Sequence, residues 1–301
     1  MTGATTPMPD TQGYARGCAL VLMAGAWLSL GGLIVRHIVV ADDWQLVFFR
    51  SLCAAVGFTL VLFVRDRERT ALTFRRSGWP ALIAGAAMAV PMITFILSVN
   101  ATSVANALFL LAVAPFLAAI IGWVVLREAI SRPTWIAMAT ALSGITIMVW
   151  NGFTVGTMFG NVMGLLAALG FATFAVALRF GRDSDMLPAV VYACVFAMIA
   201  SAAVTAFKGT GFIIPIGEFL LCLVYGAIMA GAIAVFTFGA RSVPPAELTL
   251  LSLTEVLLGP FWVWLVLNEV PETLTLVGGA VLMAAIAGLA IVNMAKRQSA
   301  Q

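Results

Sequence analysis

The stretch AELTLLSLTEVLLGPFWVWLVLNE occupies residues Ala246–Glu269 and forms one long apolar segment that closes on a glutamate. A second stretch, ANALFLLAVAPFLAAIIGWVVLRE at Ala105–Glu128, has the same length, a proline in its middle and the same closing residue. A helix needs about 20 apolar residues to cross the hydrocarbon core of a bilayer. Each stretch therefore predicts a membrane-spanning helix.

The composition extends this prediction to the whole chain. Of the 301 residues, 62% are hydrophobic and only 10% are charged, and the mean hydropathy is +1.08. This composition excludes a water-soluble domain of any size. The fold class that we predict is an all-α integral membrane protein with ten transmembrane helices, at about 17–35, 44–64, 79–98, 103–126, 133–149, 159–180, 187–207, 215–239, 246–267 and 273–294.

The two halves of the chain resemble each other. Trp123 and Glu128 recur as Trp264 and Glu269, each 141 residues later, and Arg36 recurs as Arg179, 143 residues later. Each half holds five expected spans, and because five is odd the second copy must lie upside down relative to the first. We therefore predict two inverted five-helix repeats, at 16–150 and 151–295, between a flexible cytoplasmic tail at 1–15 and a second cytoplasmic tail at 296–301. Inverted repeats are the architecture of carriers that open alternately to either side of the membrane.

The basic residues predict the orientation. With the N-terminus inside, 13 of the 16 Lys and Arg residues fall on the inner side, and only Arg36, Arg50 and Lys208 fall on the outer half. Cytoplasmic loops carry such an excess. We therefore expect a multi-pass protein of the inner (plasma) membrane with both termini in the cytoplasm.

No cofactor is expected. The four cysteines lie in expected spans without metal-ligand spacing, and the chain has no nucleotide-binding motif. The HExxH, GxSxG and paired membrane aspartate patterns of intramembrane enzymes are absent as well. We therefore expect a protein that is not an enzyme and has no catalytic residue. Its partners are expected to be a small-molecule substrate and the lipid bilayer, with no nucleic acid. The oligomeric state is left open, and a monomer is compatible with the sequence.

The two glutamate-closed stretches, together with the opening strings GCALVLMAGAWLSLGGLIVR (17–36) and GNVMGLLAALGFATFAVALR (160–179), resemble the drug/metabolite transporter superfamily. The likeness is to its ten-helix EamA-type members, and within them to YddG-type exporters of aromatic amino acids and methyl viologen. It implies a central chamber, with the fifth and tenth helices packed outside. Pro115 and Pro260 do not occupy equivalent repeat positions, so we expect the bends of the two halves to differ.

Polar and aromatic residues at membrane depth are the candidate substrate-binding residues. Glu255 stands out, because a charge in the middle of a span costs about 2.5–3.5 kcal/mol. Its carboxylate can bind a cationic group of the solute or carry a coupling proton. The alternative is a structural role, as a protonated glutamate that forms a hydrogen bond to a neighbouring helix. The candidate set is Trp27, Met88, Thr94, Phe95, Asn106, Phe109, Phe171, Phe174, Thr237, Ser252 and Glu255. For Arg50, about two turns into the second span, we expect snorkelling to the headgroups, with a salt bridge as the alternative.

A wide apolar chamber with one carboxylate suits amphipathic solutes. We therefore expect a secondary transporter that moves such solutes, amino acids above all, by alternating access and in the direction of export. The alternatives are a multidrug exporter of cationic compounds with proton antiport and, from another class, a pore-forming channel. Coupling by protons and facilitated diffusion both stay open.

Overall fold

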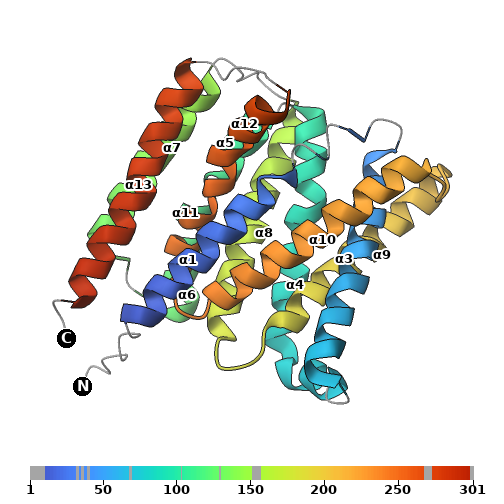
Figure 1. Cartoon of the computed structure of the whole chain (residues 1–301), viewed down its shortest axis with the longest axis horizontal. Helices are drawn as coiled ribbons and strands as arrows, with labels where there is room; N and C mark the ends of the chain where they lie inside the picture. The colour runs from blue at the N-terminus through green and yellow to red at the C-terminus, as the bar shows by residue number, and fades with distance from the viewer. Residues whose placement is uncertain are drawn as a thin grey trace.

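The computed structural model describes residues 11–31, 34, 37–38, 41–67, 70–102, 104–128, 130–150, 157–267 and 273–298. Within these ranges the chain is a bundle of α-helices (Figure 1). The first half contains α1 (Thr11–Leu28), α3 (Asp43–Asp66), α4 (Thr70–Ala101), α5 (Val104–Leu111), α6 (Ala114–Leu126) and α7 (Arg132–Val149). The second contains α8 (Met158–Phe180), α9 (Leu187–Lys208), α10 (Ile216–Gly239), α11 (Pro245–Ser252), α12 (Thr254–Leu267) and α13 (Thr273–Gln298).

These helices follow the ten expected spans in order, with α5 and α6 together forming the fourth span and α11 and α12 the ninth. Among the described residues, 7 helical segments are long and apolar enough by themselves to cross a membrane. The ninth span, which a break divides into helices of 8 and 14 residues, is not among these segments. Helices α1 and α7 have only 18 residues each, and their first turns contain polar side chains.

Helix boundaries follow local chemistry. The Ser131 hydroxyl caps α7 by accepting from the backbone N–H of Thr134 at 3.3 Å, and the Thr157 hydroxyl caps α8 by accepting from that of Gly160 at 3.1 Å. Gly209 ends α9 at a φ of 70°, which favours glycine. Two tail boundaries differ from prediction, because α1 begins at Thr11, within the expected 1–15 tail, and α13 extends to Gln298.

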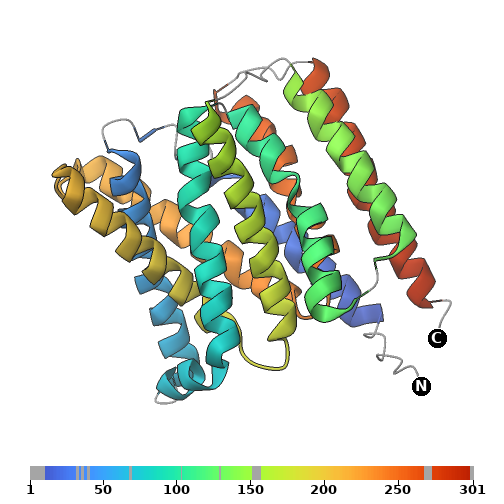
Figure 2. The same cartoon turned by 180° about the vertical axis from the view of Figure 1, so that it is seen from behind.

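Helices α7 and α13 form a pair at one edge of the bundle, and Figures 1 and 2 show them side by side from opposite directions. A methyl group at Gly144 of α7 would lie 2.9 Å from both Gly278 O and Leu282 N of α13. Only glycine permits this close approach. These are the fifth and tenth spans, and they lie outside the other helices as the family resemblance implied.

The packing of α4 on α9 depends on Gly85. A methyl group at Gly85 would lie 2.9 Å from Ala189 O and 2.5 Å from Tyr192 Cβ. It would also lie 3.1 Å from Ala193 N, one residue further along α9. The first repeat thus contributes a glycine to a tight crossing with a helix of the second.

The reciprocal crossing of α10 on α3 depends on Gly226, the repeat equivalent of Gly85. A methyl group there would lie 2.7 Å from Arg50 O and 2.9 Å from Cys53 Cβ. It would also lie 3.0 Å from Ala54 N. The same three atom types occur at the same spacing along the partner helix, so the two repeats exchange equivalent contacts, as an inverted pair requires.

The interruptions of the fourth and ninth spans are also equivalent. The turns at Val113 and at Leu253 have the same three backbone hydrogen bonds. In each, the N–H of the named residue donates to the carbonyl three residues earlier, and its own carbonyl accepts from the N–H groups three and four residues later. The offset of the two prolines predicted different bends, and the prolines do lie at different places relative to these turns. Pro115 begins α6 immediately after its turn, whereas Pro260 lies inside α12, beyond the turn at Leu253.

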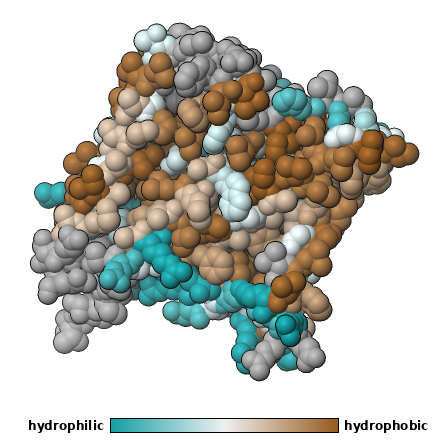
Figure 3. Space-filling model, in the orientation of Figure 1, coloured by the Kyte–Doolittle hydropathy of each residue, from teal (hydrophilic) through white to brown (hydrophobic). Residues whose placement is uncertain are grey.

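In the space-filling view, hydrophobic residues cover most of the visible face, and hydrophilic residues gather along the end that carries both termini (Figure 3). At that end the connections α3–α4, α6–α7 and α8–α9 carry exposed arginines, among them Arg67, Arg127 and Arg182. The exposed middle, with residues such as Leu60, Trp123 and Ile136, suits contact with lipid. The chain is therefore a polytopic membrane protein.

Candidate solute site

Glu255 lies in the first turn of α12, directly after the break at Leu253. Its backbone nitrogen would be 3.4 Å from a methyl group at Gly25, so this turn packs on the last turn of α1. The residue is partly exposed, and within the described ranges its carboxylate has no hydrogen bond or ion pair. An unpaired carboxylate at the break of a discontinuous helix is the arrangement in which carriers place a solute or coupling ion.

The neighbouring glutamate of the ninth span, Glu247, differs from Glu255. It is buried, and its Oε2 accepts from the Tyr14 hydroxyl at 2.7 Å while its Oε1 accepts from Thr134 Oγ1 at 3.4 Å. The Asn293 amide donates to Tyr14 Oη at 3.4 Å. Glu247 thus joins α1, α7 and α11 and, through Tyr14, α13, so its role is structural.

Trp27 packs over Gly231 of α10, where a methyl group would lie 3.4 Å from two ring carbons of the tryptophan. The tryptophan is 41% exposed and lies in the last turn of α1. At the equivalent crossing of α4 on α8 the large and small residues are exchanged: a methyl group at Gly170 would lie 2.9 Å from Val90 Cβ. The two halves therefore have different surfaces at the centre of the molecule.

Three phenylalanines join α8 to α10. The rings of Phe174 and Phe236 stack with centroids 6.0 Å apart, and Phe171 lies 5.5 Å from Phe236. Phe174 and Phe236 are buried, whereas Phe171 is partly exposed. Of the three rings, Phe171 is therefore the one that a solute could contact.

Trp262 is a polar contact at depth that the sequence analysis did not include. Its indole Nε1 donates to the Ser29 hydroxyl at 2.7 Å, which ties α12 to the end of α1. Two turns separate it from Glu255 along α12. These contacts join α1 to α10 and α12, and α8 to α10, and we call the candidate residues Trp27, Phe171, Phe236, Glu255 and Trp262 on these four helices the central cluster.

Most of the remaining candidate residues are buried. Thr94, Thr237 and Ser252 are buried, and each hydroxyl donates to a carbonyl of its own helix, at 2.9, 2.7 and 2.7 Å. Met88 belongs to the buried core. The buried Asn106 donates to Asn161 Oδ1 of α8 at 2.6 Å. Phe95 and Phe109 are partly exposed on α4 and α5.

Arg50 differs from its expected position. Its side chain is only 2% exposed, so it does not snorkel to the surface, and within the described ranges it has no salt bridge. Nη2 donates to Met92 O at 2.8 Å, Nη1 donates to the Tyr225 hydroxyl at 3.3 Å, and the guanidinium carbon lies 5.1 Å from the centre of the Tyr225 ring. The position of Arg50 two turns from the helix end did not indicate that its side chain points toward α4 and α10.

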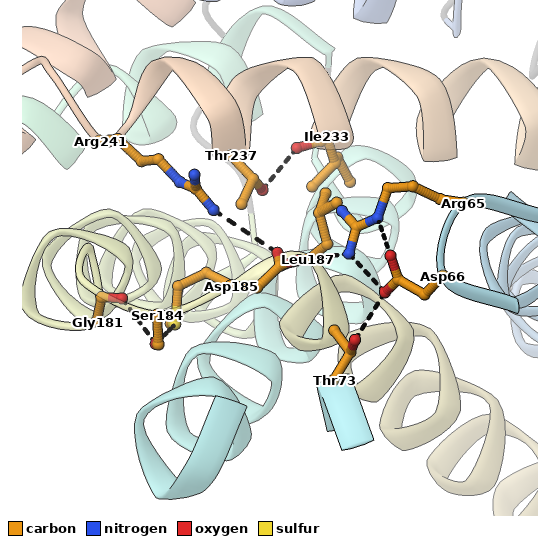
Figure 4. A network of polar contacts seen from close by, with 11 residues as sticks. Arg65, Asp66, Thr73, Gly181, Ser184, Asp185, Leu187, Ile233, Thr237 and Arg241 are labelled. Carbon is orange, nitrogen blue, oxygen red and sulfur yellow. Dashed lines mark hydrogen bonds and ion pairs between the residues drawn. The ribbon is translucent and has the colours of Figure 1, made fainter. Parts of the chain in front are cut away.

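At the end that carries the termini, an ionic network joins separate helices (Figure 4). Arg65 at the end of α3 pairs with Asp66 at 2.7 Å and with Asp185 of the α8–α9 connection. Asp185 also receives Arg241, from the end of α10, at 3.7 Å. The network holds α3, α9 and α10 together at this end.

A second ion pair at this end crosses between the repeats. Arg179 of α8 is buried, its Nε donates to Glu128 at 3.1 Å, and its Nη1 donates to Arg241 O at 3.0 Å. The repeat equivalents of this pair are Arg36 and Glu269, which lie outside the described residues. The pair explains why Arg179 tolerates its position at a membrane boundary.

The comparisons with known proteins agree with this architecture. The profile of the EamA-like transporter family matches residues 15–150 and again residues 158–291. The pseudopaline exporter CntI from each of two strains of Pseudomonas aeruginosa is 26% identical over 282 residues, covering 91% of this chain and 95% of the relative. One solved crystal structure superposes with a TM-score of 0.77 at 14% identity, covering 92% of this chain and 98% of its own, and shows the same fold. The chain therefore belongs to the EamA-like transporter family of the drug/metabolite transporter superfamily, whose members carry small molecules across membranes.

Proposed function

We propose that this transporter exports small amphipathic solutes that carry an ammonium group on an apolar body, amino acids in the first place, by alternating access. The observation that carries the proposal is Glu255, an unpaired carboxylate at the break of the ninth span. The inverted exchange of contacts at Gly85 and Gly226 supports a scaffold with two mirror-related states.

The chemistry of the central cluster suits such a solute. A carboxylate attracts an ammonium group strongly where water is scarce. The partly exposed rings of Trp27 and Phe171 offer apolar contact and cation–π attraction. Within the described chain no group of basic residues lies beside these rings, so a phosphorylated solute would find little to bind there.

One observation supports export, and a second supports the orientation of the chain in the membrane. The relatives that match over most of the chain are exporters. The arginines of the α3–α4, α6–α7 and α8–α9 connections lie at the end of the termini, which by the positive-inside rule faces the cytoplasm of the inner (plasma) membrane. The same rule places both termini in the cytoplasm.

The proposal is tested by counterflow in proteoliposomes that contain purified protein and internal phenylalanine. Glu255→Gln keeps the size of the side chain and removes its charge. We expect phenylalanine counterflow to fall at least tenfold, because a charge-assisted hydrogen bond is worth about 1.5–3 kcal/mol.

The matched control is Glu218→Gln, which makes the same chemical change near the outer end of α10. Glu218 Oε2 accepts from the backbone N–H of Ala41 at 2.9 Å, and the glutamine oxygen can accept the same bond. The control is expected to transport like the parent. Counterflow by Glu255→Gln equal to that of the parent at every pH from about 5 to 8 would remove the carboxylate from the mechanism.

The same vesicles discriminate the rival functions. A carrier saturates and shows counterflow, whereas a channel conducts without exchange. A pH gradient that drives methyl viologen in place of phenylalanine would favour a proton-coupled exporter of cationic compounds. The absence of any solute flux would contradict the carrier and the channel alike.

A further inference from the structure

Arg50 is a buried cation that plays no part in the proposed solute site at Glu255. It is a cation about two turns inside α3, buried to 98%, since only 2% of the residue is exposed. A charge at this depth is costly unless an opposite charge or several hydrogen bonds compensate it. Within the described chain, Arg50 has no carboxylate partner, and its Nε has no acceptor.

The two acceptors that Arg50 does have are of unequal quality. The bond from Nη2 to the carbonyl of Met92 is 2.8 Å long, whereas the bond from Nη1 to Tyr225 Oη is 3.3 Å long. The second exceeds the usual range of about 2.7–3.2 Å for N–H···O bonds. The Tyr225 hydroxyl is therefore an acceptor that a better one can displace.

Tyr225 contacts both Arg50 and the chain just beyond α1, the helix that carries Trp27. Its Cε2 atom would be only 2.7 Å from a methyl group at Gly31, in the chain that continues α1 beyond Trp27. Tyr225 is itself partly exposed. A solute that lies against Trp27 on α1 would thus meet Tyr225 about one turn further along and, behind its ring, the guanidinium.

We propose that Arg50, screened by Tyr225, binds the carboxylate of the transported solute. This inference rests on the proposed function and narrows its substrate class to zwitterions, with Glu255 toward the ammonium group and Arg50 toward the carboxylate. The arriving carboxylate replaces the Tyr225 hydroxyl on Nη1 and supplies the acceptor that Nε lacks. It also provides the negative charge that the buried guanidinium is missing.

The two charged residues lie at different depths, as an extended amphipathic solute requires. Glu255 packs beside Gly25 of α1, and Tyr225 packs beside Gly31. Gly25 and Gly31 are six residues apart along α1 and the hydrogen-bonded turns that follow its end at Leu28, which corresponds to about 9 Å at the helical rise.

The test compares the binding of probes that share one apolar body. Phenylalanine carries both charges, phenylalaninamide only the ammonium, and 3-phenylpropanoate only the carboxylate. Binding is measured by calorimetry on the full-length protein in a nonionic detergent without anionic lipid, and again with added phosphatidylglycerol. We expect the parent to bind phenylalanine at least tenfold more tightly than phenylalaninamide, and Arg50→Met to reduce this ratio to about one. Competition by phosphatidylglycerol in place of the solute carboxylate would overturn the assignment in favour of a lipid headgroup.

A purely structural role for Arg50 predicts a different pattern. If the guanidinium only clamps α3 to α4 and α10, Arg50→Met weakens all three probes equally and the ratio between phenylalanine and phenylalaninamide survives, which would overturn the inference. Should Arg50→Met fail to give folded protein, Tyr225→Phe serves instead. It removes the competing hydroxyl and is expected to bind 3-phenylpropanoate at least as tightly as the parent, whereas weaker binding would contradict the screening role.

The failure of this inference can be distinguished from failure of the proposed function. If the probes bind and only their dependence on Arg50 is absent, the carboxylate assignment falls and amino acid export stands. If none of the probes binds to the parent protein, both fall.

Discussion

Polar side chains at membrane depth divide into those with partners and those without. Asn106 and Asn161 satisfy each other, and Glu247 is satisfied by Tyr14 and Thr134. Within the described residues, Glu255 has no partner. A partner found in the fold indicates a structural role, and its absence is what makes Glu255 a candidate for solute contact.

The asparagine pair gives a prediction about stability. Asn106 is buried and its amide lies 2.6 Å from Asn161 Oδ1, so the bond links α5 to α8. Interhelical hydrogen bonds in membranes are worth about 0.6 kcal/mol on average and up to about 1.7. We expect Asn106→Ala and Asn161→Ala each to lower thermal stability in detergent. The double variant should cost less than the sum of the two, and strict additivity would show that the bond contributes nothing.

Sequence reasoning reached Glu255 but not Arg50, and the difference has a physical cause. A glutamate in the middle of a span is conspicuous from position alone. An arginine two turns from a helix end can snorkel, and only the fold reveals that its acceptors come from Met92 on α4 and Tyr225 on α10. Trp262 was missed for the same reason, because its partner Ser29 is 233 residues away.

At the scale of helices, a proline accompanies the break of the fourth span but not the break of the ninth. The two turns have the same hydrogen bonds although only Val113 is followed closely by a proline. The stretch around Leu253 contains no glycine or proline to mark a break. The spans were predictable from hydropathy, whereas this interruption was not, because no residue type marks it and its close packing on Gly25 of α1 is visible only in the fold.

The tight helix crossings give a second prediction. Gly85→Ala would place a methyl group 2.5 Å from Tyr192 Cβ, and Gly226→Ala would place one 2.7 Å from Arg50 O. Overpacking of this kind costs typically about 1–3 kcal/mol. Both variants are expected to unfold in detergent at lower temperature than the parent, by similar amounts.

Gly57→Ala is the matched control for these two variants. Gly57 lies inside α3, and a methyl group there would have no other atom within 4 Å. Because alanine favours helix over glycine by about 1 kcal/mol, this variant should be as stable as the parent or more so. A loss of stability at Gly57 equal to that at Gly85 would show that the crossings are not the cause.

At the scale of the whole molecule, symmetry and asymmetry have separate functions. The exchanged contacts of Gly85 and Gly226 give the two repeats one common scaffold. The centre breaks that symmetry, because Trp27 stands in one half where Gly170 stands in the other, and Glu255 follows only one of the two breaks. A common frame of two inverted repeats is the architecture in which carriers place one solute site that opens to both sides, as we propose for this chain.

The inverted arrangement is the claim on which the rest depends, and labelling of single cysteines tests it most directly. The background has Cys18, Cys53, Cys194 and Cys222 replaced by alanine. Into it are introduced, one at a time, Arg132→Cys at the start of α7, Thr273→Cys at the start of α13 and Arg241→Cys after the end of α10. All three positions are exposed. With a membrane-impermeant maleimide on intact cells and on inverted vesicles, we predict that Arg132→Cys and Arg241→Cys react from one face of the bilayer and Thr273→Cys from the other. Reaction of Arg132→Cys and Thr273→Cys from the same face would contradict the account.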